Sequence, residues 1–490
     1  MPILKKYPLQ FLLLLVAVYW FTFNISFIAQ PPIWDTATAV FPAAIYLANH
    51  SFNLAELLTQ PGWIDAGPNN YPFSPLVWWS AAVMALNFTP KTTFIILHLT
   101  QLFLVLATSA ILWNQTNFCT MKLRIVIIGL TLATPIFVVQ TGYMYSEILI
   151  CLLSLLILWA ASSQRYVLIG VIGTLIVLVK PVGVIPLASV AALLFIRRKQ
   201  HWWKKIIWAT TPGLIALVPA ILMQAGAGAP ENYITTMQDT FIRIKLIPDV
   251  MLIICVSLAI GFLVIIREFR GIEHPLSVLF SALMIWFGFG FYILVPTVSL
   301  FWFCLRYLIQ FLPFAFILIV NSLSRTSLST TSLTIVAGIC TIFQLINVFG
   351  LFYPPLPGPS FSMAERDLGY RDYFDFQRQL ITEAKYLESD SPKYVSREMF
   401  YFLTSPGIGY VSEPLDNVNF ALTTLKEPPY LPDLPNKFHI IYSYPDHGGL
   451  QLIKVMREVD SCSHCIARQK EIHHQNYTGF IYEVSQQRPN

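Results

Sequence analysis

The stretch PLQFLLLLVAVYWFTFNISFIAQPPIWDT, residues 8–36, decides how the rest of the chain is interpreted. It follows Lys5 and Lys6, and its apolar part, 9–29, is long enough to cross a bilayer. The run is too long for a signal peptide and lacks a small-residue cleavage site, so we expect an uncleaved first membrane helix. Asp35 follows almost at once, and an acid at the mouth of a membrane span is costly and usually functional.

The composition predicts a polytopic membrane protein. Of the 490 residues, 56% are hydrophobic and only 12% are charged, and the mean hydropathy is +0.61. A soluble domain cannot bury that much apolar surface. Residues 1–352 carry a net charge of +9 and residues 353–490 a net charge of −4, within the total of +5. We interpret the basic residues as reporting orientation in the membrane, and we expect no nucleic-acid partner.

Hydrophobic runs predict an all-α bundle of about eleven membrane helices in a first domain, residues 1–352. The expected spans are 8–29, 92–113, 123–141, 146–162, 166–180, 182–196, 206–225, 249–267, 276–297, 303–322 and 331–352. The apolar segment 71–88 sets the side on which every later loop lies. If it does not cross, 13 of the 18 basic residues of this domain lie inside, as the positive-inside tendency favours. We therefore expect an extracytoplasmic first loop at 30–75 and an interfacial helix at 71–88.

A second domain is predicted at residues 353–490, after a Pro-rich break at 352–359. An odd number of spans places it outside the membrane, and its patterns indicate a small α/β domain. The expected elements are helices at 363–388 and 450–459 and strands at 438–444 and 472–484.

Cys462 and Cys465 form a C-x-x-C motif in this domain. A disulfide between them is expected in an oxidising compartment. The alternative is a zinc site with His464, His473 or His474, although the spacing differs from that of the common zinc sites.

Two acids lie where the expected topology places the outer membrane surface. Asp35 opens the first loop, and Glu147 follows the turn TGYMYS at 141–146. Two carboxylates converging on one pocket could share a divalent cation, or one could act as a general base. The alternative is that each only caps the helix that follows it. Carboxylates beside aromatic rings suit sugar or polyprenol contacts, and the loop supplies Trp34, Asp65 and Tyr71.

Two cations lie at the same level. Lys180 is in LVKPVG, residues 178–183, where proline and glycine break a span at its outer end. Arg306, followed by Tyr307, lies near the outer start of the tenth span. Snorkelling to the inner surface does not account for either residue. Both are well placed to hold a phosphate at the depth of the lipid headgroups, Arg306 as a bidentate fork and Lys180 as a point charge.

The order of several short motifs resembles a known family. After the first acid come Tyr71-Pro72-x-x-Pro75 with Trp78-Trp79, then Thr134-Pro135-Ile136-Phe137 before the second acid, then Gly170-x-x-Gly173 with Val179-Lys180, and Arg306-Tyr307-Leu308-x-x-x-Leu312-Pro313. This set, over about 30–320, is similar to the GT-C glycosyltransferases of the protein O-mannosyltransferase and lipid A aminoarabinose transferase type. The segment 396–415 leading into Gly407-Ile408-Gly409-Tyr410 also resembles the C-terminal domain of bacterial members.

The resemblance implies an inverting hexosyl or pentosyl transferase. It would take a polyprenyl-phosphate-linked sugar and act on a glycan, lipid or protein acceptor at the extracytoplasmic face of a plasma membrane of the bacterial inner-membrane type. Asp35 would be the base, Glu147 the second acid, and Lys180 and Arg306 the donor-phosphate ligands. No cofactor is firmly expected. The alternative is a divalent cation bound by Asp35 and Glu147. Asn69-Asn70-Tyr71 stands where many relatives have a charged residue, which departs from the family pattern.

Two other classes of function compete. A transporter or flippase of lipid-linked sugars would need an interior polar pathway, whereas spans such as 92–113 and 276–297 contain no Asp, Glu, Lys or Arg. A non-catalytic accessory protein with a degenerate pocket is the third interpretation.

Overall fold

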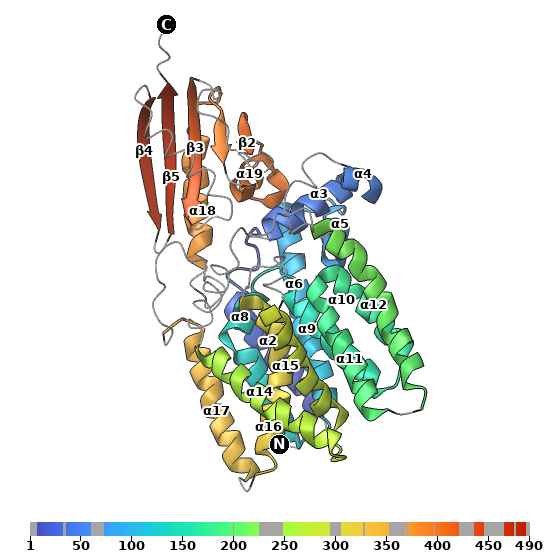
Figure 1. The fold of residues 1–490 in the computed structure, drawn as a ribbon. Coiled ribbons are helices and arrows are strands. Elements are labelled where there is room, and N and C mark those ends of the chain that lie inside the picture. Colours follow the sequence, from blue (N-terminus) through green and yellow to red (C-terminus); the bar gives the residue numbers. More distant parts are fainter. Residues whose placement is uncertain are drawn as a thin grey trace.

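The structure is a computed structural model that describes residues 7–32, 36–59, 73–198, 200–224, 248–294, 305–326, 329–351, 368, 371–395, 397–420, 436–444, 465–474 and 477–486. It is mostly helical, with a small sheet beyond one end of a helical bundle (Figure 1). We call the end of the bundle nearest the sheet the domain end and the opposite end the far end. The N-terminus lies at the far end (Figure 1).

Helices occupy all eleven positions at which the sequence predicts spans. They are α2 (Pro8–Asn24), α6 (Pro90–Gln115), α7 (Met121–Ala133) with α8 (Pro135–Thr141), α9 (Glu147–Ser162), α10 (Tyr166–Val179), η2 (Pro181–Gly183) with α11 (Val184–Arg197), α12 (Trp202–Gln224), α14 (Pro248–Phe269), α15 (Leu276–Leu294), η4 (Leu305–Phe311) with α16 (Leu312–Leu323), and α17 (Thr330–Asn347).

Within the described residues, four helices are long and apolar enough to cross a membrane: α6, α14, the stretch Arg306–Leu323, and α17. A fifth results if α7 and α8 form one span bent by 68°. The remaining apolar helices are shorter, so these helices are compatible with a multi-pass membrane protein, and the number eleven stays a prediction. The bend has a local cause, because Pro135 cannot donate to the carbonyl one turn earlier. At the residue before the proline, the Thr134 hydroxyl donates to the Leu130 carbonyl at 2.8 Å.

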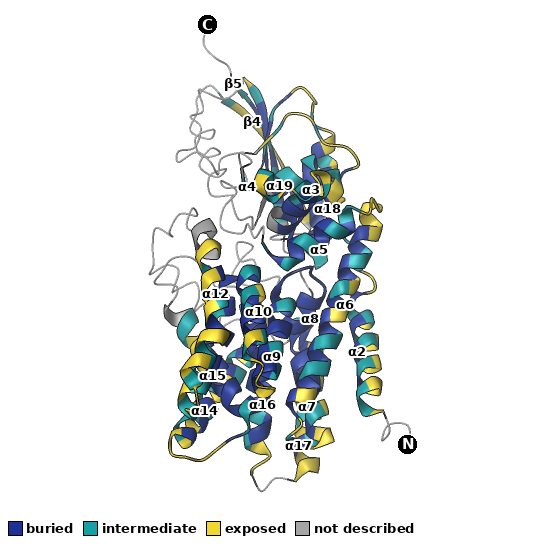
Figure 2. Ribbon diagram, turned by 90° about the vertical axis from the view of Figure 1, so that its right-hand side faces the viewer, coloured by how far each residue is buried: buried dark blue, intermediate teal, exposed yellow. Residues whose placement is uncertain are grey.

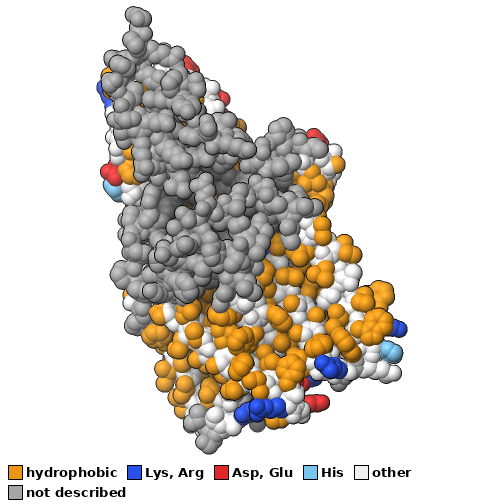
Figure 3. Space-filling model, in the orientation of Figure 1, with side chains coloured by type: hydrophobic (Ala, Val, Ile, Leu, Met, Phe, Trp, Pro, Cys, Tyr) orange, Lys and Arg blue, Asp and Glu red, His pale blue; other side chains and the backbone are white. Residues whose placement is uncertain are grey.

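The bundle presents hydrophobic side chains outward. On α14 and α17, Leu252 and Ile339 are 65% and 62% exposed. Figure 3 shows hydrophobic side chains over much of the described face of the bundle, with Lys and Arg near the far end. In contrast, α9 is buried along most of its length (Figure 2). Apolar outer faces of this extent are expected where lipid covers a bundle.

The first loop, predicted at 30–75, contains helices. Where it is described, it forms η1 (Thr36–Val40), α3 (Phe41–Asn49) and α4 (Leu54–Thr59). Buried Phe41, Ala44 and Leu47 recur every third residue, which gives α3 one apolar face. The helix α5 (Pro75–Met84) is the described part of the expected 71–88 helix and packs against α3. Its position at a membrane interface stays a prediction.

The C-terminal region contains α18 (Arg371–Lys385), β1 (Lys393–Val395), α19 (Arg397–Thr404), η6 (Pro406–Ile408), β2 (Val418–Phe420), β3 (Lys437–Tyr444), β4 (Cys465–His474) and β5 (Tyr477–Gln486). The strand order is β2-β1-β3-β5-β4, with β1 parallel to both of its neighbours and the β3–β5 and β5–β4 pairs antiparallel. The amphipathic α18 lies against β4 and β5.

The helix expected at 363–388 is confirmed by α18 where that range is described, and the strand expected at 438–444 is confirmed by β3. The single strand expected at 472–484 was wrong, because this stretch contains the end of β4 and most of β5, which pair antiparallel. Apolar residues on both strands made the run look continuous, and a two-residue connection is enough to reverse the chain. The helix expected at 450–459 lies outside the described residues.

The C-terminal region and the loops at the domain end share one hydrophobic core. It joins α3 and α5 to α18 and α19. Phe374 of α18 packs on Phe27, with ring centroids 5.9 Å apart, and Arg371 lies over the same Phe27 ring at 4.1 Å and donates to the Phe23 carbonyl. Gly409 has φ +90°, and a Cβ there would lie 2.6 Å from the Phe94 ring, so only glycine fits this contact. The sheet is thereby held directly over the domain end.

Candidate functional site

Glu147, Lys180 and Arg306 meet at the domain end of the bundle. The Lys180 ammonium donates to Glu147 Oε1, and Arg306 Nε lies 3.2 Å from the same oxygen. All three residues are buried, with relative exposures of 3%, 7% and 5% respectively. The structure thus brings together three of the four charged residues that the sequence analysis assigned to one pocket. Their formal charges sum to +1, which favours an anionic ligand.

Local sequence explains why Lys180 projects into this site. It is the last residue before η2, and its extended backbone (φ −158°, ψ 144°) ends α10. Pro181 favours this break, because a residue before proline is disfavoured in the helical conformation. Gly183 lets the chain turn tightly, since a Cβ there would lie 2.6 Å from the Ile176 carbonyl.

Glu147 is the first residue of α9, and Ser146 is its N-cap. The sequence analysis left open whether Glu147 only caps this helix. Its carboxylate instead bonds to Lys180 and pairs with Arg306, while the helix N-terminus adds a favourable partial positive charge. The capping alternative therefore does not describe the carboxylate in this structure.

Tyrosine rings flank the two cations. The Lys180 Nζ lies 4.8 Å from the Tyr307 ring centroid, and the Arg306 Cζ lies 4.6 Å from that of Tyr145. The Tyr145 ring in turn stacks on Tyr143 at 4.9 Å. Such contacts orient the cations without neutralising them. Tyr307 was predicted, whereas Tyr143 and Tyr145 were missed, although both stand in the turn directly before Glu147.

A small cavity of about 10 Å³ lies against this cluster, lined by Glu147, Ile150, Val182, Arg306, Tyr307 and Gln310. Its volume is close to the minimum for one water molecule. The buried Oε2 of Glu147 has no hydrogen-bond partner among the described residues. A buried polar atom of this kind normally bonds to water or to a ligand.

Polar side chains from other helices hold the turn that carries Glu147. Asn24 Nδ2 donates to Thr141 Oγ1 at 3.1 Å, and Gln101 Nε2 donates to the Tyr145 carbonyl at 3.1 Å. His98, one turn before Gln101 on α6, is buried against the backbone of this turn at Gly142. These residues were also missed. For His98 and Gln101, the available signal was a histidine and a glutamine three positions apart in a span that contains no Asp, Glu, Lys or Arg.

The other predicted site residues lie outside the described residues: Trp34, Asp35, Asp65, Tyr71 and Cys462. Thr36 follows Asp35 in the chain, and its hydroxyl is 3.4 Å from the Met144 carbonyl in the same turn. Cys465 is disulfide-bonded. No group of three or more His, Cys, Asp or Glu residues within the described part of the chain could hold a metal ion.

Searches of known proteins give no match, either to a family model or to a curated protein. The charged cluster therefore has to be interpreted from its own geometry.

Proposed function

We propose that this protein is a membrane glycosyltransferase that moves a sugar from a polyprenyl-phosphate donor to a lipid, glycan or protein acceptor on the extracytoplasmic face. The observation that carries the proposal is the pair of buried cations, Lys180 and Arg306, at the domain end. Burial of two cations is costly, and the cost is offset when an anion binds between them. A phosphate ester at the level of the membrane surface has the charge and the position for this role.

In the proposed reaction, an acceptor hydroxyl attacks the anomeric carbon of the sugar while the bond from that carbon to the phosphate oxygen breaks. The electron pair leaves with the phosphate, whose growing charge Lys180 and Arg306 would stabilise more in the transition state than in the ground state. Asp35 is the proposed base that accepts the hydroxyl proton. Asp35 itself lies outside the described residues, and its chain neighbour Thr36 contacts the turn before Glu147.

We assign Glu147 a positioning role. Its Oε1 is shared by Lys180 and Arg306, so the carboxylate holds the two cations at a fixed separation before the donor arrives. An acid engaged by two cations is poorly suited to remove a proton from the acceptor. The proposed division of work is therefore a base at Asp35 and a phosphate clamp organised by Glu147.

The first test measures binding of polyprenyl phosphate to the purified protein in nanodiscs. Arg306→Ala removes a charge-assisted contact, so we expect binding to weaken about 10- to 100-fold. Arg197→Ala is the matched control, because Arg197 is also paired with a buried carboxylate, Glu268 at 3.1 Å, but lies at the far end. Equal loss in both variants, or no loss in Arg306→Ala, would exclude the phosphate clamp.

The second test separates catalysis from transport. With a labelled polyprenyl-phosphate sugar, Asp35→Asn is expected to abolish sugar transfer while donor binding persists. Loss of donor flipping in a protein that never transfers sugar would favour a flippase instead. Unchanged transfer in both Asp35→Ala and Glu147→Ala would favour an accessory protein.

A further inference from the structure

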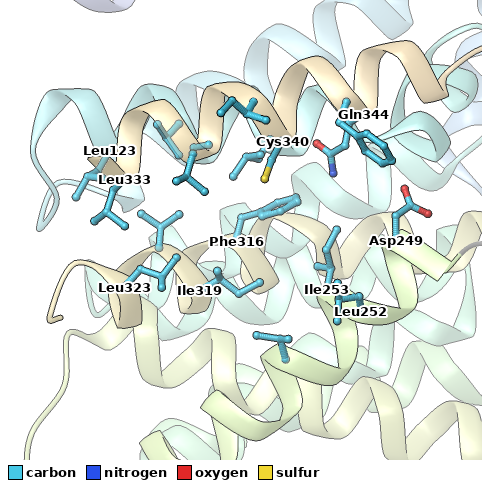
Figure 4. Close-up of a pocket in the computed structure, with 18 residues that line it drawn as sticks. Leu123, Asp249, Leu252, Ile253, Phe316, Ile319, Leu323, Leu333, Cys340 and Gln344 are labelled. Atoms are coloured by element: carbon cyan, nitrogen blue, oxygen red, sulfur yellow. The ribbon is translucent and has the colours of Figure 1, made fainter. Parts of the chain in front are cut away.

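A second cavity lies between α7, α14, α16 and α17. Its volume is about 480 Å³, within the range of about 300–1,000 Å³ that small-molecule sites occupy. It shares no lining residue with the cavity beside Glu147. Figure 4 shows α17 on one side and α14 and α16 on the other, with side chains from both sides pointing into the space between them.

The cavity is a groove with a buried floor and an exposed rim. Phe316 and Val320 of α16 form part of the floor and are 3% and 4% exposed. Leu252 of α14 and Ile339 of α17 form part of the rim and are 65% and 62% exposed. The rim thus continues into the apolar outer surface of the bundle. An occupant would enter sideways from the medium that covers this surface.

Among the described lining residues, the carboxylate and the amide lie at one end of the groove. Along α17 the lining runs from Leu333 to Gln344, which corresponds to a length of about 16 Å at 1.5 Å per residue. At the domain end, Gln344 and Asp249 face each other across the groove (Figure 4). The other lining side chains are hydrophobic. Such a lining disfavours water along the length of the groove and can form hydrogen bonds with an occupant at the domain end, where Gln344 and Asp249 lie. We call this end the mouth of the groove.

We propose that this groove binds one aliphatic chain of an amine-headed membrane phospholipid, with the amine at Asp249. The length and apolar lining match a lipid tail. The carboxylate at the mouth complements an ammonium group, whereas a terminal phosphate, as in a polyprenyl phosphate, would meet a like charge. The site is separate from the proposed donor clamp, so either proposal can fail without the other.

Photo-crosslinking in nanodiscs tests the inference. The probe is a phosphatidylethanolamine with a diazirine in the middle of one chain, compared with a phosphatidylglycerol that has the same chains. Label on Phe316 or Val320 requires a chain inside the groove, because both residues are buried beneath the rim. We expect phosphatidylethanolamine to label this floor about five times more than phosphatidylglycerol does. This ratio corresponds to an ion pair worth about 1 kcal/mol between the amine and Asp249.

Two adjacent residues of α17 provide a matched pair of variants. Val336 lines the groove and is 55% exposed, whereas Ile335 is 59% exposed and does not line it. Val336→Trp should fill the groove and reduce floor labelling about tenfold, whereas Ile335→Trp should leave it unchanged. Asp249→Asn should keep the labelling but bring the ratio of the two lipids to about one.

Three outcomes would overturn the proposal. The first is an unlabelled floor in the unaltered protein, and the second is equal floor labelling in Val336→Trp and Ile335→Trp. The third is displacement of the phosphatidylethanolamine by added polyprenyl phosphate, which would assign the groove to the donor tail. A lipid ratio that survives Asp249→Asn would contradict the headgroup assignment.

Discussion

Replacing Glu147 by Gln should destabilise the ligand-free protein and make its stability depend on an added anion. The substitution keeps the shape of the side chain but removes the only carboxylate within the described cluster. At the 3.2 Å between Arg306 Nε and Glu147 Oε1, the Coulomb attraction is about 5 kcal/mol at an effective dielectric constant of about 20. Breaking a buried ion pair from one side costs about 3–5 kcal/mol, because the other charge stays buried. We expect a loss of that size.

The assay is thermal unfolding of the detergent-solubilised protein. The measured quantity is the fraction of protein that stays monodisperse after heating to each temperature. Polyprenyl phosphate, used for every variant at about 100 times the dissociation constant of the unaltered protein, adds about 2.7 kcal/mol to the stability of that protein if it binds only the folded state. The gain should be larger in Glu147→Gln than in the unaltered protein, because the phosphate then replaces the missing carboxylate between Lys180 and Arg306.

Glu268→Gln is the control for this experiment. Glu268 is also buried and pairs with Arg197 at 3.1 Å and with His274 at 3.3 Å, but at the far end. It should lose stability by a similar amount and gain no more from polyprenyl phosphate than the unaltered protein does. The reasoning is refuted if Glu147→Gln unfolds at the unaltered temperature, or if the ligand stabilises both variants equally.

Three further changes test the fold. Gly170→Ala places a Cβ 2.6 Å from a backbone oxygen of α12 and should cost about 1–3 kcal/mol in thermal unfolding, whereas Gly129→Ala, with nothing within 4 Å, should cost almost none. Burial lowers the pKa of His439 in β3 below its ordinary 6.5, so the unfolded sheet binds more protons and stability falls as the pH drops below 6.5. Limited proteolysis across that range should show this loss, and His439→Gln should flatten it. Arg371→Ala removes the cation 4.1 Å from the Phe27 ring, which should lower the free energy of unfolding by about 1–2 kcal/mol. Limited proteolysis should then cut the contact region between the bundle and the sheet more rapidly than in the unaltered protein.

Much of the fold could be predicted because membrane helices are encoded by composition over a long window. The predicted spans coincide with helices from α2 to α17, and the exposed residues of α14 and α17 show why the pattern is so strong. The helices of the first loop were not predicted with bounds, because their apolar residues contact α5, α6 and the C-terminal region, all of which lie outside these helices in the sequence. The β4–β5 hairpin was missed for a different reason, since two adjacent strands of similar composition carry no boundary in their hydropathy.

The candidate site was partly predictable, because helix breaks are local. Lys180 before Pro181 and Glu147 after a glycine-containing turn are both visible in the sequence. Which acid would pair with which cation was not visible, since that depends on how α9, α10 and η4 pack. The supporting polar residues, His98 and Gln101, could not be assigned either, because a polar side chain in a span reveals its partner only when the facing turn is known.

Two buried charge clusters in the described part of the bundle differ in how their carboxylates are used. At the far end, Glu268 uses both oxygens, one toward Arg197 and the other toward His274, and Arg197 also donates to the His274 carbonyl. At the domain end, two cations share one oxygen of Glu147, its second oxygen has no hydrogen-bond partner among the described residues, and the residue lines a water-sized cavity. A buried ion pair is in general no more stabilising than well-packed apolar side chains. A cluster that keeps two cations, and a carboxylate oxygen with no hydrogen-bond partner among the described residues, therefore gains little as a stabilising element, and this is the reason for which we propose that it binds an anion.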